Sequence, residues 1–283
     1  MGLSFKEVFL LSRPRFWMYV LGTFLVGMVA GGNPFAHDWF TVFCLSALGL
    51  FFSLPANVLI YGVNDIYDYQ TDINNDKKLK YENVLAPAKH GSLWKIIIIL
   101  ILPFIPLFFF INLPAKLALI VFLFTGVFYS ANPIRAKSKP PLDILFSAVI
   151  YVSPAVVGFY LTGNMNLEWL AVLGGLIWAF GMQTYSAVPD ISADKSAGVR
   201  TLATELGEKK ALWFCLFCYL ISVSIGYFYI GTISLFFGFT YAIIVFLSLR
   251  NSQKLFKYYT YFPLINVITG TVLFFFLFFK EIS

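Results

Sequence analysis

Charged residues are scarce in this sequence. Asp, Glu, Lys and Arg together make up 12% of its 283 residues, whereas 59% are hydrophobic and 33 residues are phenylalanine. Typical soluble domains contain about 25% charged residues. The mean hydropathy is +0.80. This composition excludes an ordinary soluble domain and is typical of a polytopic, all-α membrane protein.

Residues that commonly form redox or zinc sites are also few, with three cysteines and two histidines. Cys215 and Cys218 form a C-x-x-C pair, but it lies inside an apolar stretch without the polar surroundings or further ligands that such sites need. His37 and His90 lack metal-ligand spacing. The net charge of +6 has no accompanying basic patch on a soluble fold, so nucleic acid is not an expected partner.

Long apolar stretches predict the membrane topology. The predicted spans are residues 14–31, 40–62, 93–112, 115–130, 142–162, 168–188, 211–229, 232–249 and 261–279. If the N-terminus is cytoplasmic, eighteen of the 20 Lys and Arg residues fall on the cytoplasmic side, and only Lys116 and Lys280 fall outside. Such an imbalance follows the positive-inside rule and supports nine transmembrane helices.

The same topology places the large loops together. Residues 63–92, 131–141 and 189–210 all lie on the predicted cytoplasmic side, whereas the outer connections are short. We therefore expect a single domain over residues 1–283, located in the cell membrane. A cap of cytoplasmic loops would cover an active site that faces the cytoplasm.

The end of the second predicted span bears a row of polar side chains. Asn57, Asn64, Asp68 and Asp72 are separated by seven, four and four residues, so they share one face of a helix. Acidic groups at the mouth of a membrane helix are costly and usually functional. Asp65 lies off this face, and both a catalytic base and a solvated helix cap are open interpretations.

A second polar row closes the sixth predicted span. Gln183, Asp190 and Asp194 repeat the spacing of Asn57, Asn64 and Asp68 after an interval of 126 residues. We predict two helices with facing acidic stripes. Mg²⁺ is the simplest ion between them, because it binds few carboxylates together with substrate phosphates.

Cations suited to a diphosphate accompany these rows. Arg135 and Lys139 follow Tyr129 and Ser130 in a proline-containing loop, and Lys195 follows Asp194 directly. An Arg side chain can bind phosphate oxygens in a bidentate manner, and Lys supplies a point charge. A purely topogenic loop is the alternative. The segment 12–17, SRPRFW, is interpreted as an anchor at the lipid headgroups.

Three motifs together resemble the UbiA superfamily of membrane prenyltransferases. They are N-x-x-x-D-x-x-x-D at 64–72, YS-x-x-P-x-R-x-K within 129–139, and D-x-x-x-D-K-x-x-G-x-x-T at 190–201. Residues 12–22 and 187–207 are most similar to lycopene elongases within that superfamily. One departure is the stretch 82–89, ENVLAPAK, where many members have Arg-Pro; Lys89 is a possible substitute.

The resemblance implies Mg²⁺-dependent transfer of a prenyl group from an allylic diphosphate to a hydrophobic acceptor within the membrane. It implies catalytic and metal-binding roles for Asp68, Asp72, Asp190 and Asp194, with Asn64 as a further metal ligand. The implied substrate-binding residues are Asn57, Asn64, Tyr129, Arg135, Lys139 and Lys195. Tyr61, Tyr67, Tyr129 and Tyr185 are expected either to stabilise an allylic cation or to be interface aromatics.

The sequence leaves the identity of the acceptor undecided, and two other classes of protein are alternatives. A carotenoid such as lycopene is the favoured acceptor, and an aromatic quinone precursor is the alternative. An ion-coupled transporter would place its acidic residues near the middle of the bilayer in broken helices. A phosphatidyltransferase would contain D-G-x-x-A-R, which is missing.

Overall fold

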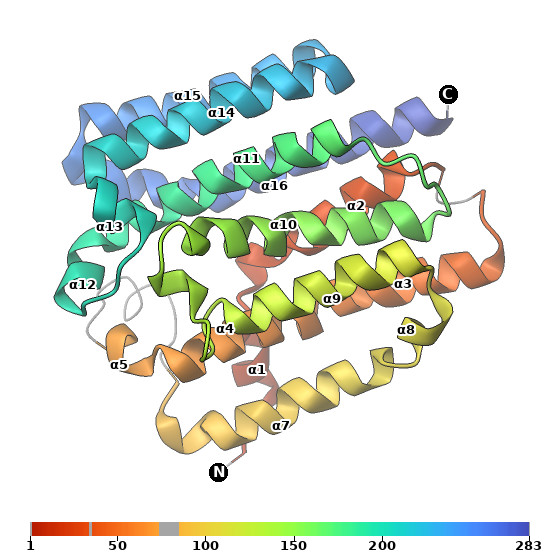
Figure 1. Cartoon of the computed structure of the whole chain (residues 1–283), viewed down its shortest axis with the longest axis horizontal. Helices are drawn as coiled ribbons and strands as arrows, with labels where there is room; N and C mark the ends of the chain where they lie inside the picture. The colour runs from red at the N-terminus through yellow and green to blue at the C-terminus, as the bar shows by residue number, and fades with distance from the viewer. Residues whose placement is uncertain (1, 34–35, 74–84, 283) are drawn as a thin grey trace. The chain divides into compact units, whose positions relative to one another are not determined.

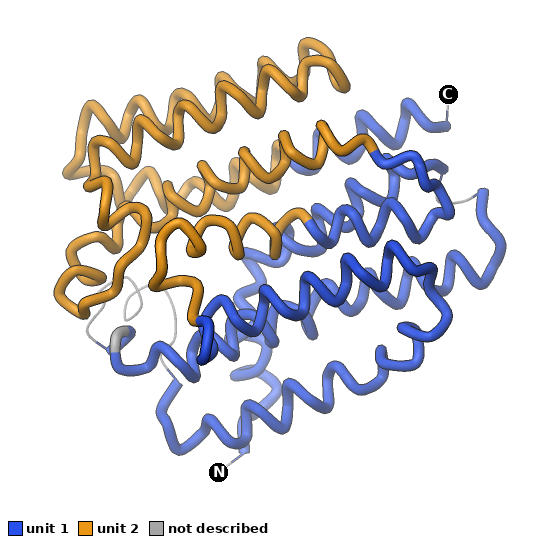
Figure 2. The backbone as a smooth tube through the Cα atoms, viewed as in Figure 1, with its two compact units in different colours: residues 1–134, 153–167, 270–283 blue, residues 135–152, 168–269 orange. Residues whose placement is uncertain are grey.

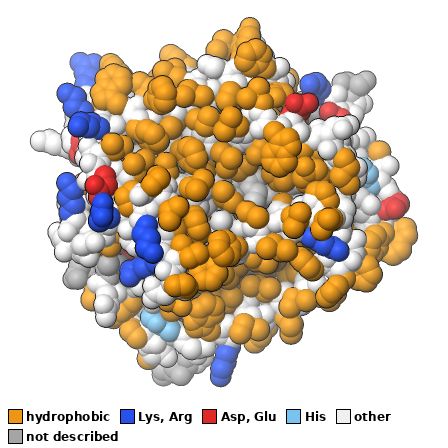
Figure 3. Space-filling model, viewed as in Figure 1, with side chains coloured by type: hydrophobic (Ala, Val, Ile, Leu, Met, Phe, Trp, Pro, Cys, Tyr) orange, Lys and Arg blue, Asp and Glu red, His pale blue; other side chains and the backbone are white. Residues whose placement is uncertain are grey.

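Apolar helices form the structure. The computed structural model describes residues 2–33, 36–73 and 85–282, and within these ranges it contains helices and turns but no strand (Figure 1). Hydrophobic side chains cover most of the face seen in Figure 3. Such a surface is favourable in contact with lipid. The all-α expectation is therefore confirmed for the described residues.

Seven described helices are long and apolar enough to cross a membrane. They are Trp39–Tyr67, Pro87–Phe110, Leu142–Leu161, Trp169–Ser196, Glu208–Ile230, Thr232–Arg250 and Ser252–Ile282. Two shorter apolar helices, Pro14–Ala30 and Leu113–Phe128, coincide with the first and fourth predicted spans. The structure thus supports seven candidate spans, and the full count of nine stays a prediction.

The chain divides into two compact units (Figure 2). Unit 1 comprises residues 1–134, 153–167 and 270–283, and unit 2 comprises residues 135–152 and 168–269. Two helices contribute residues to both units, α10 (Leu142–Leu161) and α16 (Leu255–Ile282).

Unit 1 is built around α4. Its elements include α1 (Phe5–Leu11), η1 (Pro14–Tyr19), α2 (Leu21–Ala30), α3 (Trp39–Phe52), α4 (Leu54–Tyr67), α5 (Tyr69–Asp72), η2 (Pro87–Lys89), α7 (His90–Ile101), η3 (Leu102–Phe104), α8 (Leu107–Phe110) and α9 (Leu113–Phe128). Helix α4 packs against α1, α3, α7 and α9. Val58 and Val63 of α4 belong to the same core cluster as Leu93 and Ile97 of α7.

The second predicted span is not one continuous helix. Helix α3 ends at Phe52, Ser53 has φ −79° and ψ −106°, and α4 begins at Leu54. Pro55 follows immediately and has no N–H to donate into the preceding turn. The Asn57 side chain donates from Nδ2 to the carbonyl oxygens of Phe52 (3.1 Å) and Ser53 (2.5 Å). The predicted span over residues 40–62 therefore lies within the apolar segment Trp39–Tyr67, which is interrupted at Ser53, and Asn57 stabilises the break.

Small residues allow α2 and α10 to approach closely. A Cβ atom added to Gly158 would overlap the Phe24 carbonyl oxygen, and one added to Gly27 would overlap the Ala155 backbone. Such contacts between backbones are typical of helix packing in membranes.

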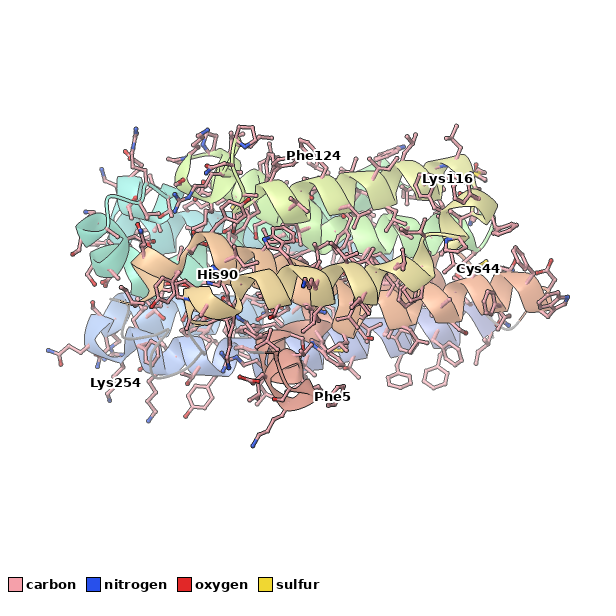
Figure 4. All side chains as sticks on the ribbon, turned by 90° about the horizontal axis from the view of Figure 1, so that it is seen from below. Phe5, Cys44, His90, Lys116, Phe124 and Lys254 are labelled. Atoms are coloured by element: carbon pink, nitrogen blue, oxygen red, sulfur yellow. The ribbon has the colours of Figure 1, made fainter. Side chains whose placement is uncertain are left out.

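Figure 4 shows Phe5 projecting from α1, and the side chain is 77% exposed.

Unit 2 consists mainly of long helices that pack against one another. Its elements are η4 (Ala136–Ser138), the first part of α10, α11 (Trp169–Ala187), η5 (Val188–Asp190), α12 (Ile191–Ser196), α13 (Leu202–Leu206), α14 (Glu208–Ile230), α15 (Thr232–Arg250), η6 (Ser252–Lys254) and the first part of α16. Helix α11 packs against α14, which packs against α15 (Figure 1). Cys215 and Cys218 are buried free thiols on α14.

Candidate functional site

The first acidic motif lies where α4 ends. Asp68 leaves the helical conformation with φ −106° and ψ 5°, and α5 follows it. The backbone N–H of Asp68 still donates to the Asn64 carbonyl (2.9 Å), and that of Asp72 donates to the Asp68 carbonyl (2.9 Å). The helical spacing predicted for the three residues is thus kept. Asp68 is 0% exposed and Asp72 is 6% exposed.

Asn64 links this motif to the end of α9. Its Nδ2 donates to Asp68 Oδ2 (2.7 Å) and to Ser130 Oγ (3.0 Å). Ser130 is 1% exposed and directly follows Tyr129, which is half-buried. The Asn64 amide therefore orients the Asp68 carboxylate. Sequence reasoning gave Ser130 no role of its own, although it is part of the YS motif.

A buried ion pair flanks the same turn of α4. Arg13 Nη2 donates to Asp65 Oδ1 at 2.5 Å, with side chains that are 10% and 3% exposed. The guanidinium carbon also lies 4.6 Å from the centroid of the Tyr61 ring. Tyr61 and Asp65 are one helical turn apart, so a single guanidinium contacts both.

This pair corrects three expectations. Asp65 is not a solvated cap, because its side chain is 3% exposed and is paired with Arg13. Arg13 is buried inside unit 1 and is not a headgroup anchor. One face of Tyr61 is covered by a cation of the protein itself, so that face is not available to an allylic cation. The indole N–H of Trp17 donates to the Ser12 carbonyl at 3.1 Å, which also ties the segment 12–17 to the protein.

The second acidic motif lies on a short helix after α11. Asp190 ends η5 and Asp194 lies within α12; both are half-buried, and Lys195 is exposed. Gln183 lies within α11, where its Oε1 accepts a hydrogen bond from Ser147 Oγ at 2.6 Å. The two aspartates keep the four-residue spacing that the sequence predicted.

Two other residues of this motif build the turn between α12 and α13. Gly198 has φ +68°, its N–H donates to the Lys195 carbonyl (3.2 Å), and the next N–H, from Val199, donates to the Asp194 carbonyl (2.8 Å). This pair of bonds is a Schellman motif, in which glycine is favoured. Thr201 then caps α13, its hydroxyl accepting from the Thr204 N–H at 3.1 Å.

The cationic loop begins in unit 1 and continues in unit 2. Tyr129 belongs to unit 1, whereas Arg135 and Lys139 belong to unit 2. Arg135 has the left-handed conformation, φ 44° and ψ 57°, directly before η4, and its carbonyl accepts from Ser138 Oγ at 3.2 Å. Arg135 is half-buried and Lys139 is exposed.

Lys89, the possible substitute for the missing Arg-Pro, ends η2 and has a partner within the protein. Its Nζ donates to Glu7 Oε1 of α1 in an ion pair. The hydrogen bond from Lys89, followed by those from Ser4, lowers the pKa of Glu7 to about 2. Lys77 and Lys78, two further cations in the predicted cytoplasmic loop 63–92, lie outside the described residues.

The donor atoms suit a metal that arrives with its substrate. Among the described residues, no three His, Cys, Asp or Glu side chains gather into a group that would hold a metal ion by themselves. Each unit instead offers two aspartates four residues apart: Asp68 and Asp72 in one, Asp190 and Asp194 in the other. Mg²⁺ usually keeps several waters and binds one or two carboxylates plus substrate phosphates, so the residues present fit it.

Known proteins resemble this chain over nearly its whole length. Residues 20–277 match the UbiA prenyltransferase family. The lycopene elongase/hydratase of Halobacterium salinarum is 34% identical over 275 residues, covering 95% of each chain. That of Haloarcula japonica is 35% identical over 268 residues, covering 93% of this chain and 87% of the relative.

Solved structures share the fold. The structure of a UbiA homolog from Archaeoglobus fulgidus bound to GPP and Mg²⁺ superposes with a TM-score of 0.75 at 20% identity, covering 98% of this chain and 100% of that chain. A structure described as bound to DMAPP and Mg²⁺ gives a TM-score of 0.70 at the same identity, covering 94% and 98% of the two chains. At this identity the likeness concerns the arrangement of the helices.

Proposed function

Because the chain belongs to the UbiA prenyltransferase family, and is therefore a membrane prenyltransferase, we propose that it transfers prenyl groups from an allylic diphosphate to the ends of a carotenoid such as lycopene. The observation that supports this acceptor is the identity of about one third to lycopene elongase/hydratases across nearly the full length of both chains. The resemblance inferred from the three motifs is confirmed at the level of the family.

The two acidic motifs are the proposed diphosphate site. Asp68, Asp72, Asp190 and Asp194 are the proposed Mg²⁺ ligands, and bound Mg²⁺ would neutralise the charge of the leaving diphosphate. Asn64 would contribute mainly by orienting Asp68, since its Nδ2 holds that carboxylate and Ser130.

The chain's own cations are proposed to bind the same diphosphate. Arg135 can present two N–H groups to phosphate oxygens, whereas Lys139 and Lys195 are point charges that adjust to the substrate. Tyr129 is proposed to contact the substrate beside them. The substrate contact predicted for Asn57 would be made by its Oδ1 atom, which is buried without a hydrogen-bond partner among the described residues.

The proposed reaction needs an apolar site from which bulk water is excluded. Breaking the C–O bond of the donor releases diphosphate and leaves an allylic cation, which bulk water would destroy. The carotenoid double bond attacks that cation, a C–C bond forms, and the positive charge moves to the acceptor. The relatives' names pair elongation with hydration, and we propose that a water oxygen adds to this second cation with loss of a proton.

The proposed topology has nine spans and places the site at the cytoplasm. Seven described helices meet the length of a span, and two shorter apolar helices coincide with the remaining predicted spans. The distribution of Lys and Arg supports a cytoplasmic N-terminus in the cell membrane. A single domain is proposed because α10 and α16 each contribute to both compact units and the family match runs from 20 to 277.

Product analysis tests this function directly. The purified protein in lipid nanodiscs would receive Mg²⁺ and labelled dimethylallyl, geranyl, farnesyl or geranylgeranyl diphosphate, each with lycopene or with aromatic acceptors, and the products would be identified by mass. We expect five-carbon additions to lycopene with release of diphosphate. Prenylation of an aromatic ring alone would refute the carotenoid acceptor but keep the enzyme class.

Substitutions test the site. Asp68→Asn and Asp190→Asn should each abolish Mg²⁺-dependent release of diphosphate. Asp38→Asn is a matched control, because Asp38 is exposed, caps α3 by accepting from the Thr41 N–H at 2.7 Å, and Asn is an equally good cap. Full activity of Asp68→Asn and Asp190→Asn would contradict the proposed metal site.

A further inference from the structure

Helix α10 holds the second acidic motif from both sides within unit 2. Ser147 Oγ donates to Gln183 Oε1 at 2.6 Å, and Gln183 precedes the motif. Asp143 Oδ2 accepts from the backbone N–H of Leu202 at 2.6 Å, and Leu202 follows the motif. Asp143 and Ser147 are four residues apart, so they lie on the same face of α10.

The environment of Asp143 is costly for a carboxylate. Its side chain is 3% exposed, and Oδ1 is buried with no hydrogen-bond partner among the described residues. A buried acidic group in a membrane helix is expensive unless it has a specific task. The hydrogen bond to Leu202 is a specific contact, because it binds the first N–H of α13, which has no acceptor within its own helix.

Short backbone connections join Asp143 to the proposed ligands on both sides. Beyond Leu202, the chain reaches Val199, whose N–H donates to the carbonyl of Asp194 itself at 2.8 Å. In the other direction, the N–H of Leu142 donates to the carbonyl of Lys139 at 2.7 Å. Asp143 therefore connects the turn that follows the proposed metal ligand Asp194 to the loop that bears the proposed phosphate cations.

We propose that Asp143 is a positioning residue for the diphosphate: it holds the second acidic motif at a constant distance from the 135–139 loop, so that carboxylates and cations meet the same diphosphate. This inference rests on the proposed function. Asp143 itself does not contact either substrate. Through the second acidic motif and the 135–139 loop it affects binding of the donor and its metal, and it does not affect binding of the carotenoid.

The test separates donor binding from acceptor binding. Asp143→Ala should raise the donor KM and the Mg²⁺ concentration for half-maximal activity by about tenfold or more, since a hydrogen bond to a charged acceptor is lost. The acceptor KM should stay within about twofold of the wild type. Asp143→Asn should recover most of the donor affinity, because its amide oxygen can still accept from the Leu202 N–H.

Two further variants keep the test decisive. Ser147→Ala removes the other bond from α10 and should raise the donor KM by a smaller factor, about threefold, even if Asp143→Ala does not fold. Ser222→Ala is the matched control: it removes a 2.9 Å bond to the Gly174 carbonyl between α14 and α11, and the donor KM should not change.

The outcomes are distinguishable. Wild-type protein without Mg²⁺-dependent transfer would refute the proposed function itself. An active wild type with an unchanged donor KM in Asp143→Ala would refute only the positioning role. The same refutation follows if Asp143→Asn is as impaired as Asp143→Ala, if donor and acceptor KM rise together, or if Ser222→Ala has the same effect. Isothermal titration calorimetry with inorganic diphosphate and Mg²⁺ should rank the wild type and the variants by affinity in the same order as their donor KM values.

Discussion

The buried pair of Arg13 and Asp65 should show a large coupling energy. Arg13→Gln would leave a carboxylate that is 3% exposed without its cation, and Asp65→Asn would leave a guanidinium that is 10% exposed without its anion. Removing one partner of a buried pair costs about 3–5 kcal/mol, because the remaining charge is uncompensated. Removing both partners costs far less, since no buried charge is left.

The expected coupling follows from these magnitudes. If each single variant loses about 3 kcal/mol and the double variant Arg13→Gln/Asp65→Asn loses about 3 kcal/mol or less, the magnitude of the interaction energy is at least about 3 kcal/mol. The contact of Arg13 with the Tyr61 ring, at 4.6 Å, should add to the cost of the Arg13 variant alone. A cation–π contact contributes about 0.5–2 kcal/mol.

A double-mutant cycle measures this quantity. Free energies of unfolding would be determined for the four proteins in mixed micelles with a denaturing detergent. The matched control is the cycle for Arg200 and Glu205, whose ion pair is 2.7 Å long but whose side chains are 71% and 45% exposed. An exposed pair should couple by less than about 1 kcal/mol. Additive effects of Arg13→Gln and Asp65→Asn, within about 0.5 kcal/mol, would refute the buried pair and restore the headgroup anchor.

Three further predictions concern local contacts. The pKa of Glu7 lies near 2 instead of its ordinary 4.5, so its ion pair with Lys89 is complete above about pH 4.5 and is lost as the pH falls toward 2; a carbon-13 NMR titration should show this midpoint, and Lys89→Met should raise it. Gly158→Ala should destabilise the protein by about 1–3 kcal/mol, because the added methyl group meets the Phe24 backbone, and thermal unfolding would measure it. Gly198→Ala should cost about 1–2 kcal/mol at φ +68°, measured in the same way.

Local patterns in the sequence predicted much of the fold. The apolar stretches and the described helices coincide closely, because a membrane helix must satisfy its own backbone and be apolar along its length. The helical spacing predicted for Asn64, Asp68 and Asp72 was also confirmed, since the i to i−4 hydrogen bonds continue through the end of α4. Both features depend only on residues close together in the chain.

Contacts between distant segments were not predictable in this way. Arg13 and Asp65 are 52 residues apart, and Asn64 and Ser130 are 66 residues apart. Hydrophobic periodicity indicates which face of a helix is apolar, but it does not identify which polar group on another helix will be the partner. The break at Ser53 had a local signal, because Pro55 two residues later cannot donate a backbone hydrogen bond.

The second acidic motif combines two kinds of residue that the sequence presents as one pattern. Asp190, Asp194 and Lys195 supply charge, whereas Gly198 and Thr201 end one short helix and begin the next. Their spacing has a structural cause: a Schellman turn needs its left-handed residue four positions after Asp194, and the following helix then needs a cap. Substitutions at Gly198 and Thr201 should therefore mainly lower the stability of the protein. Substitutions at Asp190 and Asp194 should instead abolish activity while the protein stays folded.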